Sequence, residues 1–390
     1  MRVLVVNAGS SSLKVDIVED GETVESHDGL PAVAPQVDAV GHRIVHGGPD
    51  LVEPVVIDAG IERRLGELVD LAPLHQPKSL RGLDAARHLL PDVPHVACFD
   101  TAFHATLPPE AYTYALPREW REHRGVRRYG FHGLSHAWAA RRAAEMVPGS
   151  HRVVTCHLGA GASLAAVLDG RSVDTTMGFT PLDGLVMATR SGSVDPGLVT
   201  WLQLHEDLSP QEVTDILENR CGLLGLAGTA DMRELLGRDD DAAKLALDVY
   251  VHRLAGSAAG MTAGLGGLDV LVFTGGVGER AAEVRRRTTD RLAYLGVRID
   301  DQLNALAEPD ADISAGDTGH DDSVRVLVIA SREDLQIAAE VEQVLASGST
   351  RDGHAAASRS RRRDVSISAS AAARPAQAAP STLLPGSRSL

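Results

Sequence analysis

Two arginines lie among small, turn-forming residues, where packing does not require a long charged side chain. Arg43 is in GHRIVHGG and Arg190 is in MATRSGSVDPG, both among glycine, serine and other turn-forming residues. A guanidinium group binds carboxylate or phosphate in a bidentate manner and neutralises charge that develops during phosphoryl transfer. Each arginine taken alone could equally be a surface side chain over a turn. Together, the two arginines indicate a site that binds an anion such as a carboxylate or a phosphate.

Two carboxylates are candidates for binding Mg²⁺. Asp100, in ACFDTAFH, follows an expected strand, where an acid can project from the sheet edge into a cleft. Glu333 stands in the first turn of the expected last helix, where a negative charge also suits the helix dipole. For Glu333 alone, the dipole explanation is the simpler one.

Three glycine-rich stretches, 7–12, 157–163 and 274–279, are expected to be loops at strand ends. Such turns expose backbone N–H groups to phosphate oxygens without interference from a Cβ, so three of them predict a polyphosphate cradle. None is a P-loop, because Ser12-Leu13-Lys14 stands where Gly-Lys-Ser/Thr would be needed. The stretch 276–281 matches G-x-G-x-x-A, which leaves a dinucleotide-binding dehydrogenase as a rival, although it opens no visible βαβ unit.

His132 and His136 are spaced to share one face of a helix. Without an intervening glutamate they do not form a zincin motif. We expect hydrogen-bonding histidines near a charged cleft rather than a metal centre, with His132, in YGFHGLSH, the best placed.

The elements that must position these residues alternate between β-rich runs and helical patterns, which predicts α/β architecture. The expected strands are 2–7, 13–19, 94–99, 152–157, 163–168, 269–274 and 325–330. Ser209 to Glu212 reads as a capping box with proline in the first turn, and Gly222 is expected to close that helix. Further helices are expected over 241–264 and from 331 to near Gly348.

An internal similarity links two segments about 150 residues apart. VVNAGSSSLKVDIVEDG and VVTCHLGAGASLAAVLDG share a strand, a Gly/Ser loop, Ser-Leu, a return strand and an acid-Gly turn. This plan predicts a duplicated unit in which each half begins with a β-hairpin whose loop faces a common cleft.

Length and charge set further bounds. A chain of 390 residues can form two domains, because single cores rarely exceed roughly 250–300 residues. The formal net charge is −15, and seven arginines against two aspartates after residue 350 leave −20 on the body. This balance argues against a broad nucleic-acid surface. Three scattered cysteines fit a reducing compartment, and without a signal-type region or membrane span we expect a cytoplasmic protein.

The C-terminal segment 350–390 is rich in serine, alanine, arginine and proline and poor in large apolar residues. Such a composition cannot bury enough surface to offset chain entropy, so we expect a disordered tail. The cluster 361–363 leaves a partner or nucleic-acid patch as an alternative to a solvated tail.

The chain resembles the acetate kinase family, within the acetate and sugar kinase, heat-shock ATPase and actin superfamily. The resemblance runs in order across about 1–346 in NAGSSSLK, HRIVHGG, FDTAFHATLP, RRYGFHGLSH, MGFTPLDGLVMATRSGSVDP and FTGGVGE. It implies a duplicated actin-like fold, with a ribonuclease H-like βββαβαβα core in each of two domains, and an ATP cleft between them. The first domain would comprise 1–104 plus 335–349 and the second, nucleotide-binding and dimerising, 105–334.

The resemblance also implies roles by position. Catalytic roles would fall on Asp100, Arg43, Arg190 and His132. The apolar pocket for the acyl group, beside Arg43, would consist of Val45, Leu74, Phe131 and Pro181. Nucleotide contacts would come from Asn7, Ser10, Ser12, Lys14, His157, Gly159, Ala160, Gly161, Asp231, Met232, Arg233, Gly276, Val277, Gly278 and Arg280. Asn7 and Glu333 would bind Mg²⁺, or Mn²⁺ in its place.

Some positions depart from the family pattern. Ala160 and Arg280 each replace a usual asparagine, Gln76 replaces the asparagine of Leu-His-Asn-Pro, and Met232 stands where an aromatic residue is frequent. The stretch 20–41 is several tens of residues shorter than the family's.

The sequence therefore predicts a cytoplasmic, homodimeric kinase that transfers phosphate from ATP to acetate, giving acetyl phosphate and ADP. A propionate kinase, a kinase using another donor such as pyrophosphate, and a non-catalytic nucleotide-binding relative remain as alternatives. No nucleic-acid or membrane partner is expected.

Overall fold

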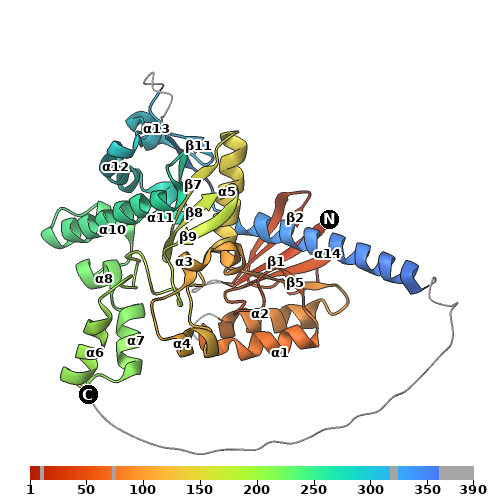
Figure 1. Cartoon of the computed structure of the whole chain (residues 1–390). Helices are drawn as coiled ribbons and strands as arrows, with labels where there is room; N and C mark the ends of the chain where they lie inside the picture. Colours follow the sequence, from red (N-terminus) through yellow and green to blue (C-terminus); the bar gives the residue numbers. More distant parts are fainter. Residues whose placement is uncertain (9–12, 73–75, 317–323, 360–390) are drawn as a thin grey trace, which may run out of the picture. The chain divides into compact units, whose positions relative to one another are not determined.

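Two six-stranded sheets organise the chain in a computed structural model, which describes residues 1–8, 13–72, 76–316 and 324–359, the last twelve of them by backbone alone (Figure 1). Sheet A has the order β3-β2-β1-β4-β6-β5, and sheet B has the order β11-β12-β10-β7-β8-β9. The strands of sheet A are β1 (Arg2–Ala8), β2 (Leu13–Glu19), β3 (Glu22–Asp28), β4 (Ala39–Ile44), β5 (Val55–Val56) and β6 (His95–Phe99). Those of sheet B are β7 (Arg152–Leu158), β8 (Ala162–Leu168), β9 (Arg171–Thr175), β10 (Val270–Thr274), β11 (Ala311–Asp312) and β12 (Arg325–Val328).

The two sheets repeat one topology, which confirms the predicted duplication. In each, three antiparallel strands form a meander, and two further strands add in parallel beside the first strand. Each sheet then ends in a two-residue antiparallel edge strand. The acid-Gly turns also correspond, because Asp20-Gly21 and Asp169-Gly170 all have positive φ. Positive φ at both central residues gives a turn whose twist matches a β-hairpin.

Helices cover both faces of each sheet. On sheet A, α2 (Gln76–Leu89) contacts β1 and β4. The other face of sheet A packs Val3 and Val5 against Ile337 and Val341 of α14 (Glu333–Arg359). On sheet B, α10 (Asp241–Leu265) contacts β7 and β8, and α5 (Gly133–Met146) contacts β7 and β10. Because helices pack on both faces, each sheet is covered on its two sides.

Shorter helices fill the connections. They are α1 (Ala59–Glu67), α3 (Pro109–Tyr112), α4 (Arg118–His123), α6 (Pro196–His205), α7 (Pro210–Asn219), α8 (Gly222–Ala227), α9 (Met232–Leu236), α11 (Gly275–Arg280), α12 (Ala282–Arg291) and α13 (Asp301–Leu306). Three short 3₁₀ turns lie at Val69–Leu71, Ala102–Thr106 and Ala293–Leu295.

Met1–Leu345 is one compact unit that contains both sheets. The predicted boundary near residue 104 falls between the last strand of sheet A and the first of sheet B, and the division into two domains stays a prediction. The predicted end of the last helix near Gly348 is wrong, because α14 continues to Arg359. The run Ala355-Ala356-Ala357 near the end of that stretch favours helix. Within the tail predicted over 350–390, residues 360–390 lie outside the described residues.

Two further local predictions are also wrong. Within the stretch 274–279, Thr274 ends β10 and residues 275–279 belong to the helix α11 rather than to a loop. The Glu279 carboxylate accepts a hydrogen bond from Gly275 N at 3.1 Å. Gly222 does not close α7, which ends at Asn219, but begins α8. Its φ is +61°, and a Cβ there would lie 2.1 Å from the Met187 carbonyl oxygen, so close backbone approach explains this glycine. The capping box at Ser209 and Glu212 is confirmed.

Candidate active site

Three side chains meet at the carboxyl ends of three parallel strands of sheet A. Asn7 lies near the end of β1, Arg43 near the end of β4, and Asp100 directly after β6. The guanidinium of Arg43 donates to both oxygens of Asp100, from Nη2 to Oδ2 at 2.7 Å and from Nε to Oδ1 at 3.1 Å. Ligands of α/β sheets commonly bind at this edge. The cluster therefore occupies a position suited to chemistry.

The first turn of α14 adds a second carboxylate to the cluster. Asn7 Nδ2 donates to Glu333 Oε2 at 3.0 Å, and Arg43 Nη1 lies 3.6 Å from the same oxygen. Arg43 Nη1 also donates to Asn7 Oδ1 at 3.2 Å. The side chains of Arg43, Asp100 and Glu333 are only 14%, 2% and 12% exposed. Glu333 therefore does more than complement a helix dipole.

Burial and pairing set the charges of this cluster. Burial alone would lower the pKa of Arg43, but Asp100 and then Glu333 raise it above its ordinary value. Burial raises the pKa of Asp100, and Arg43 opposes that rise. Burial would also raise the pKa of Glu333, but the charges of Arg43 and His157 and the Asn7 hydrogen bond lower it. One guanidinium thus compensates two nearly buried carboxylates.

His132 lies at the start of α5, with its backbone in the left-handed region at φ 57° and ψ 24°. Its Nδ1 is 2.9 Å from Ser163 Oγ, and its ring centroid is 4.4 Å from that of His157. Burial, then His157 and Arg43, lower the pKa of His132 well below its ordinary value. His132 is therefore neutral at pH 7.

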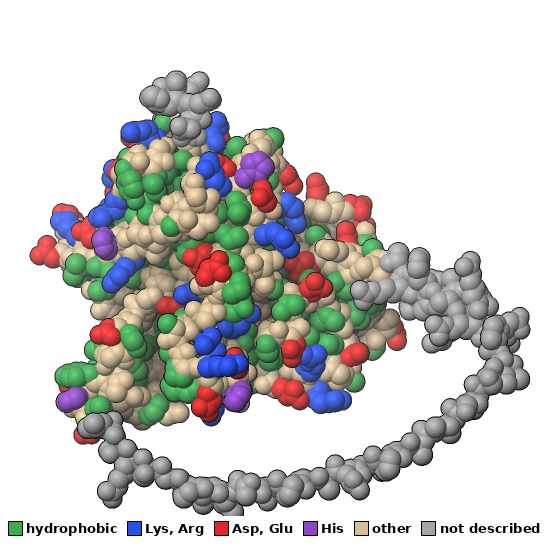
Figure 2. Space-filling view, viewed as in Figure 1, with side chains coloured by type: hydrophobic (Ala, Val, Ile, Leu, Met, Phe, Trp, Pro, Cys, Tyr) green, Lys and Arg blue, Asp and Glu red, His purple; other side chains and the backbone are tan. Residues whose placement is uncertain are grey.

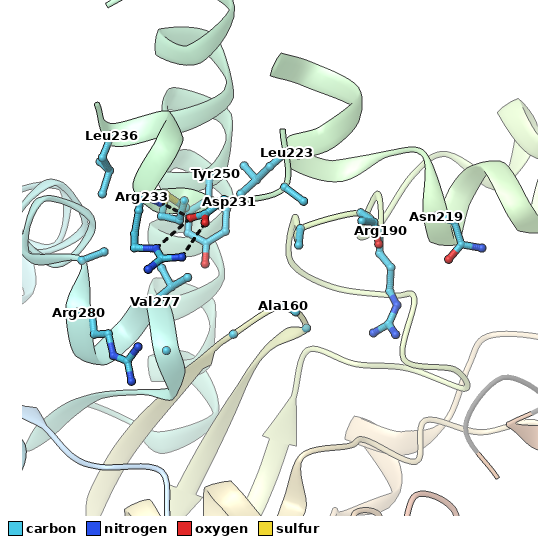
Figure 3. A pocket seen from close by; sticks show the side chains of 18 of the residues that line it. Ala160, Arg190, Asn219, Leu223, Asp231, Arg233, Leu236, Tyr250, Val277 and Arg280 are labelled. Carbon is cyan, nitrogen blue, oxygen red and sulfur yellow. Dashed lines mark hydrogen bonds and ion pairs between the residues drawn. The ribbon is translucent and has the colours of Figure 1, made fainter. Parts of the chain in front are cut away.

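A cavity of about 820 Å³ opens above the loop between β7 and β8 (Figure 3). Most of the residues predicted to contact nucleotide line it. They are Gly159, Ala160, Gly161, Asp231, Met232, Arg233, Gly276, Val277 and Arg280. Arg190 also lines the cavity, and Asp231 pairs with Arg233 at 2.9 Å. Ligand pockets commonly measure 300–1,000 Å³, so this cavity has the size for a nucleotide.

Gly161 connects the cavity to His132. A Cβ on Gly161 would lie 3.1 Å from His132 Nε2 and 3.4 Å from Arg190 Nη1. Ala188 N donates to Ala160 O at 3.1 Å, which joins the Arg190 loop to the β7–β8 loop. Burial lowers the pKa of Arg190, although an arginine stays charged at neutral pH. Two positive side chains, Arg43 and Arg190, thus flank one neutral histidine.

The other predicted nucleotide residues lie elsewhere. Lys14 lines a separate hollow of about 930 Å³ with Arg332 and Asp334. His157 stacks on His132 rather than lining the cavity, and its Nδ1 is 2.8 Å from Ser135 Oγ. Gly278 is buried in α11. Ser10 and Ser12 lie outside the described residues.

The predicted acyl pocket is represented by two buried apolar side chains, Val45 and Phe131, which share one hydrophobic cluster. The His46 ring packs against Phe131 with a centroid distance of 5.5 Å. Pro181 is half-buried in the loop between β9 and α6, and Leu74 lies outside the described residues.

The first turn of α2 supplies Gln76, which the sequence had indicated near the substrate pocket, and Lys78, which the sequence did not reveal. Gln76 is fully buried, accepts from His46 N at 3.3 Å and donates to His46 O at 3.2 Å, so it holds the chain beside Val45. Lys78 lines the nucleotide-sized cavity from α2. The signal for Gln76 was the motif Leu74-His75-Gln76-Pro77, and Lys78 carried no signal beyond its place just after that motif.

The residues that the structure describes contain no group of three or more histidine, cysteine, aspartate or glutamate side chains placed to hold a metal ion. No helix in them is long and apolar enough to cross a bilayer. On the face shown in Figure 2, lysine and arginine side chains are interspersed with aspartate and glutamate.

The cavity has the size for a nucleotide, its lining residue Gly161 lies beside His132, and the charge of Arg43 in the buried cluster acts on His132. On a duplicated α/β fold, this is the arrangement of a phosphotransferase. The model of the Acetokinase family matches residues 22–339. The chain belongs to this family.

Individual relatives agree with that assignment. An acetate kinase of Deinococcus deserti is 48% identical over 84% of this chain and 83% of its own. A solved propionate kinase of Francisella tularensis is 35% identical with a TM-score of 0.80, covering 87% of this chain and 98% of its own. A solved acetate kinase of Porphyromonas gingivalis is 34% identical with a TM-score of 0.79, covering 88% and 99%. The predicted duplicated ATPase fold is thereby confirmed.

Proposed function

We propose that this protein transfers the γ-phosphoryl group of ATP to acetate, giving acetyl phosphate and ADP. The observation that carries the proposal is the buried Arg43, Asp100 and Glu333 cluster, which His132 and Gly161 link to a nucleotide-sized cavity. Family membership makes a carboxylate the acceptor of choice. In the reaction, a carboxylate oxygen forms a bond to the γ-phosphorus while the bond to the bridging oxygen of ADP breaks.

The chemistry needs charge neutralisation more than a base. Acetate is ionised at neutral pH, because carboxylic acids of this kind lose their proton near pH 4 to 5. Two anions must therefore approach each other, and positioned cations lower that barrier. Arg43 would orient the carboxylate, and Arg190 would stabilise the phosphoryl oxygens. His132, being neutral, would donate one hydrogen bond to the phosphoryl group.

The residues present fit a divalent metal such as Mg²⁺. A carboxylate oxygen is the hard donor that Mg²⁺ prefers. Glu333 Oε1 can serve as such a donor, because it accepts no hydrogen bond from the residues that the structure describes. Mg²⁺ is commonly held by one or two carboxylates together with substrate phosphates. Glu333 would hold the metal, with Asn7 orienting that carboxylate. The bound metal would supply charge neutralisation on the phosphates.

The size of the cavity favours ATP over pyrophosphate as donor. Apolar side chains such as Leu223, Met232 and Leu236 line it together with Asp231 and Arg233. A pyrophosphate site would need only a small polar cradle, whereas a nucleoside needs apolar surface for its base. The departures at Ala160 and Arg280 leave this cavity open.

The acyl pocket favours a short chain. Val45 and Phe131 are 4% and 1% exposed, and Gln76 fixes the backbone beside Val45. Acetate is the first choice and propionate the second, since one methylene in an apolar pocket changes discrimination by only about 1–3 kcal/mol. We also propose a cytoplasmic homodimer, as the resemblance implies.

Trapping the acyl phosphate as its hydroxamate tests this function. Acetate, propionate and butyrate are each offered with ATP or with pyrophosphate in the presence of Mg²⁺. We expect product with ATP and acetate at the highest kcat/KM, less with propionate, and none with pyrophosphate. A protein that binds ATP yet forms no hydroxamate from any pair would be a non-catalytic relative.

A further inference from the structure

A chain of buried hydrogen bonds runs from His132 away from the cavity. His132 Nδ1 lies 2.9 Å from Ser163 Oγ, and the same oxygen lies 2.8 Å from His136 Nε2. His136 Nδ1 lies 2.7 Å from Thr155 Oγ1. Ser163, His136 and Thr155 are all fully buried. Their mutual hydrogen bonds couple the protons of these groups, because each hydroxyl has one proton to donate.

With neutral imidazoles, two proton arrangements make every contact of this hydrogen-bond chain while both hydroxyls also donate a hydrogen bond. In the first, His132 Nδ1–H donates to Ser163, Ser163 to His136, His136 to Thr155, and Thr155 to Ala165 O. In the second, every donor is reversed, so Thr155 donates to His136, His136 to Ser163, and Ser163 to His132 Nδ1. The first arrangement leaves a lone pair on His132 Nε2, and the second places a proton there.

The second arrangement suits an anion in the cavity. His132 Nε2 accepts or donates no hydrogen bond among the described residues, and it lies beside cavity-lining Gly161. A lone pair would repel a phosphoryl oxygen, whereas an N–H would bind it. The reversal gives up only the bond from Thr155 Oγ1 to Ala165 O, which is long at 3.5 Å.

We propose that Ser163 and His136 are positioning residues that fix His132 in the tautomer with its proton on Nε2, directed at the transferring phosphoryl group. The proposal rests on the proposed kinase function. Neither residue touches substrate, and both act through His132. The left-handed backbone of His132 contributes by holding the ring between Ser163 and the cavity.

The kinetic test compares Ser163→Ala with Thr155→Val. Ser163→Ala removes the donor to His132 Nδ1, so we expect kcat to fall about 10- to 100-fold, less than or equal to the loss of a direct donor to a developing charge. KM for ATP and for acetate should stay within about twofold. Thr155→Val is the matched control. Thr155 is equally buried in the same chain of hydrogen bonds, and its replacement leaves Ser163 and the His136 group that donates to it in place. Its kcat should stay within about threefold, at a similar change in melting temperature.

The spectroscopic test reads the tautomer itself and does not need turnover. Protein labelled with ¹⁵N-histidine is loaded with Mg²⁺, ADP, acetate and aluminium fluoride, a planar anion that stands in for the phosphoryl group. In the wild-type protein, the His132 nitrogen shifts should show Nε2 protonated and Nδ1 unprotonated. In Ser163→Ala, the share of His132 with the proton on Nε2 should fall, because Nδ1 then lacks the hydroxyl donor that favours this tautomer.

Each outcome decides a separate point. A loaded wild-type protein with the proton on Nδ1, or an unchanged tautomer in Ser163→Ala, overturns the proposal whether or not the variant is active. An equal loss of kcat in Thr155→Val would assign the chain a structural role and likewise overturn it. Absence of acyl phosphate from the wild-type protein would instead overturn the kinase function, and the tautomer measurement would still stand.

Discussion

Replacing Arg43 by glutamine tests the electrostatic core of the site. Arg43 is 14% exposed, makes a two-pronged ion pair with Asp100, which is 2% exposed, and lies 3.6 Å from Glu333. Glutamine keeps much of the side-chain length but removes the charge. Two carboxylates are then left nearly buried without their cation, and such a charge is costly to leave uncompensated.

The structure sets the size of the effect. Removing one partner of a buried ion pair commonly costs about 3–5 kcal/mol of the free energy of unfolding. When Asp100 is already asparagine, the same change should cost less, about 1–2 kcal/mol, because only the longer contact with Glu333 and the remaining hydrogen bonds are then lost. The coupling between the two substitutions should therefore be about 2–3 kcal/mol.

The pH dependence has a definite sign. Without Arg43, the pKa of Asp100, which burial already raises, should rise further. A carboxyl group whose folded-state pKa is raised holds its proton in the folded state after the unfolded chain has lost it, so stability falls as pH rises through this interval. Arg43→Gln should thus lose more stability at pH 8 than at pH 5, relative to the wild-type protein.

Urea unfolding of the four proteins of the cycle, followed by circular dichroism at pH 5 and pH 8, measures both quantities. Arg43→Gln and Asp100→Asn are the single variants, and the double variant completes the cycle. Strictly additive costs, with a coupling below about 0.5 kcal/mol, would refute the electrostatic reasoning. So would an Arg43→Gln deficit that grows as the pH is lowered.

Three further changes follow from named contacts. Arg190→Ala should lower kcat by about 10³-fold or more without unfolding the chain, because an arginine on a transferring phosphoryl group is commonly worth 10³–10⁵; near-normal turnover would remove it from the site. Burial raises the pKa of Glu340 to about 7, so wild-type stability should fall between pH 5 and 8. Glu340→Gln should remove the Glu340 share of that fall, a gain of up to about 3 kcal/mol at pH 8 in urea unfolding. Gln76→Ala leaves His46 N–H and C=O without their side-chain partner, so stability should fall by about 1–3 kcal/mol. KM for acetate should rise several-fold; an unchanged KM would show that Gln76 does not shape the acyl pocket.

Much of the framework was predictable because its strands are apolar and buried. All seven expected strands are present within one or two residues at each end, and the two hairpin copies align because each carries the same acid-Gly turn. β3 was missed because its residues, ETVESHD, are polar and largely exposed at a sheet edge. β4 was missed because glycine, histidine and arginine interrupt its apolar pattern.

Site residues that lie in a recognisable motif were predictable from the sequence. Roles that depend on contacts between distant segments were not. Glu333 looked like a dipole-complementing acid until β1 brought Asn7 to it from 326 residues away. Lys78 has no motif of its own and reaches the cavity only because α2 packs on sheet A. Arg43 and Asp100 pair because β4 and β6 are adjacent parallel strands, a register that local pattern does not encode.

Phosphoryl transfer is measured most directly in the energetically favourable direction, from acetyl phosphate to ADP. A mixed anhydride of this kind readily gives up its phosphoryl group, and both directions share one transition state. The wild-type protein with Mg²⁺, ADP and acetyl phosphate should form ATP and acetate in equal amounts, seen by ³¹P NMR, and Arg190→Ala should form neither at a comparable rate. Release of inorganic phosphate without ATP, or no reaction in a protein that binds ADP, would contradict an acetate kinase.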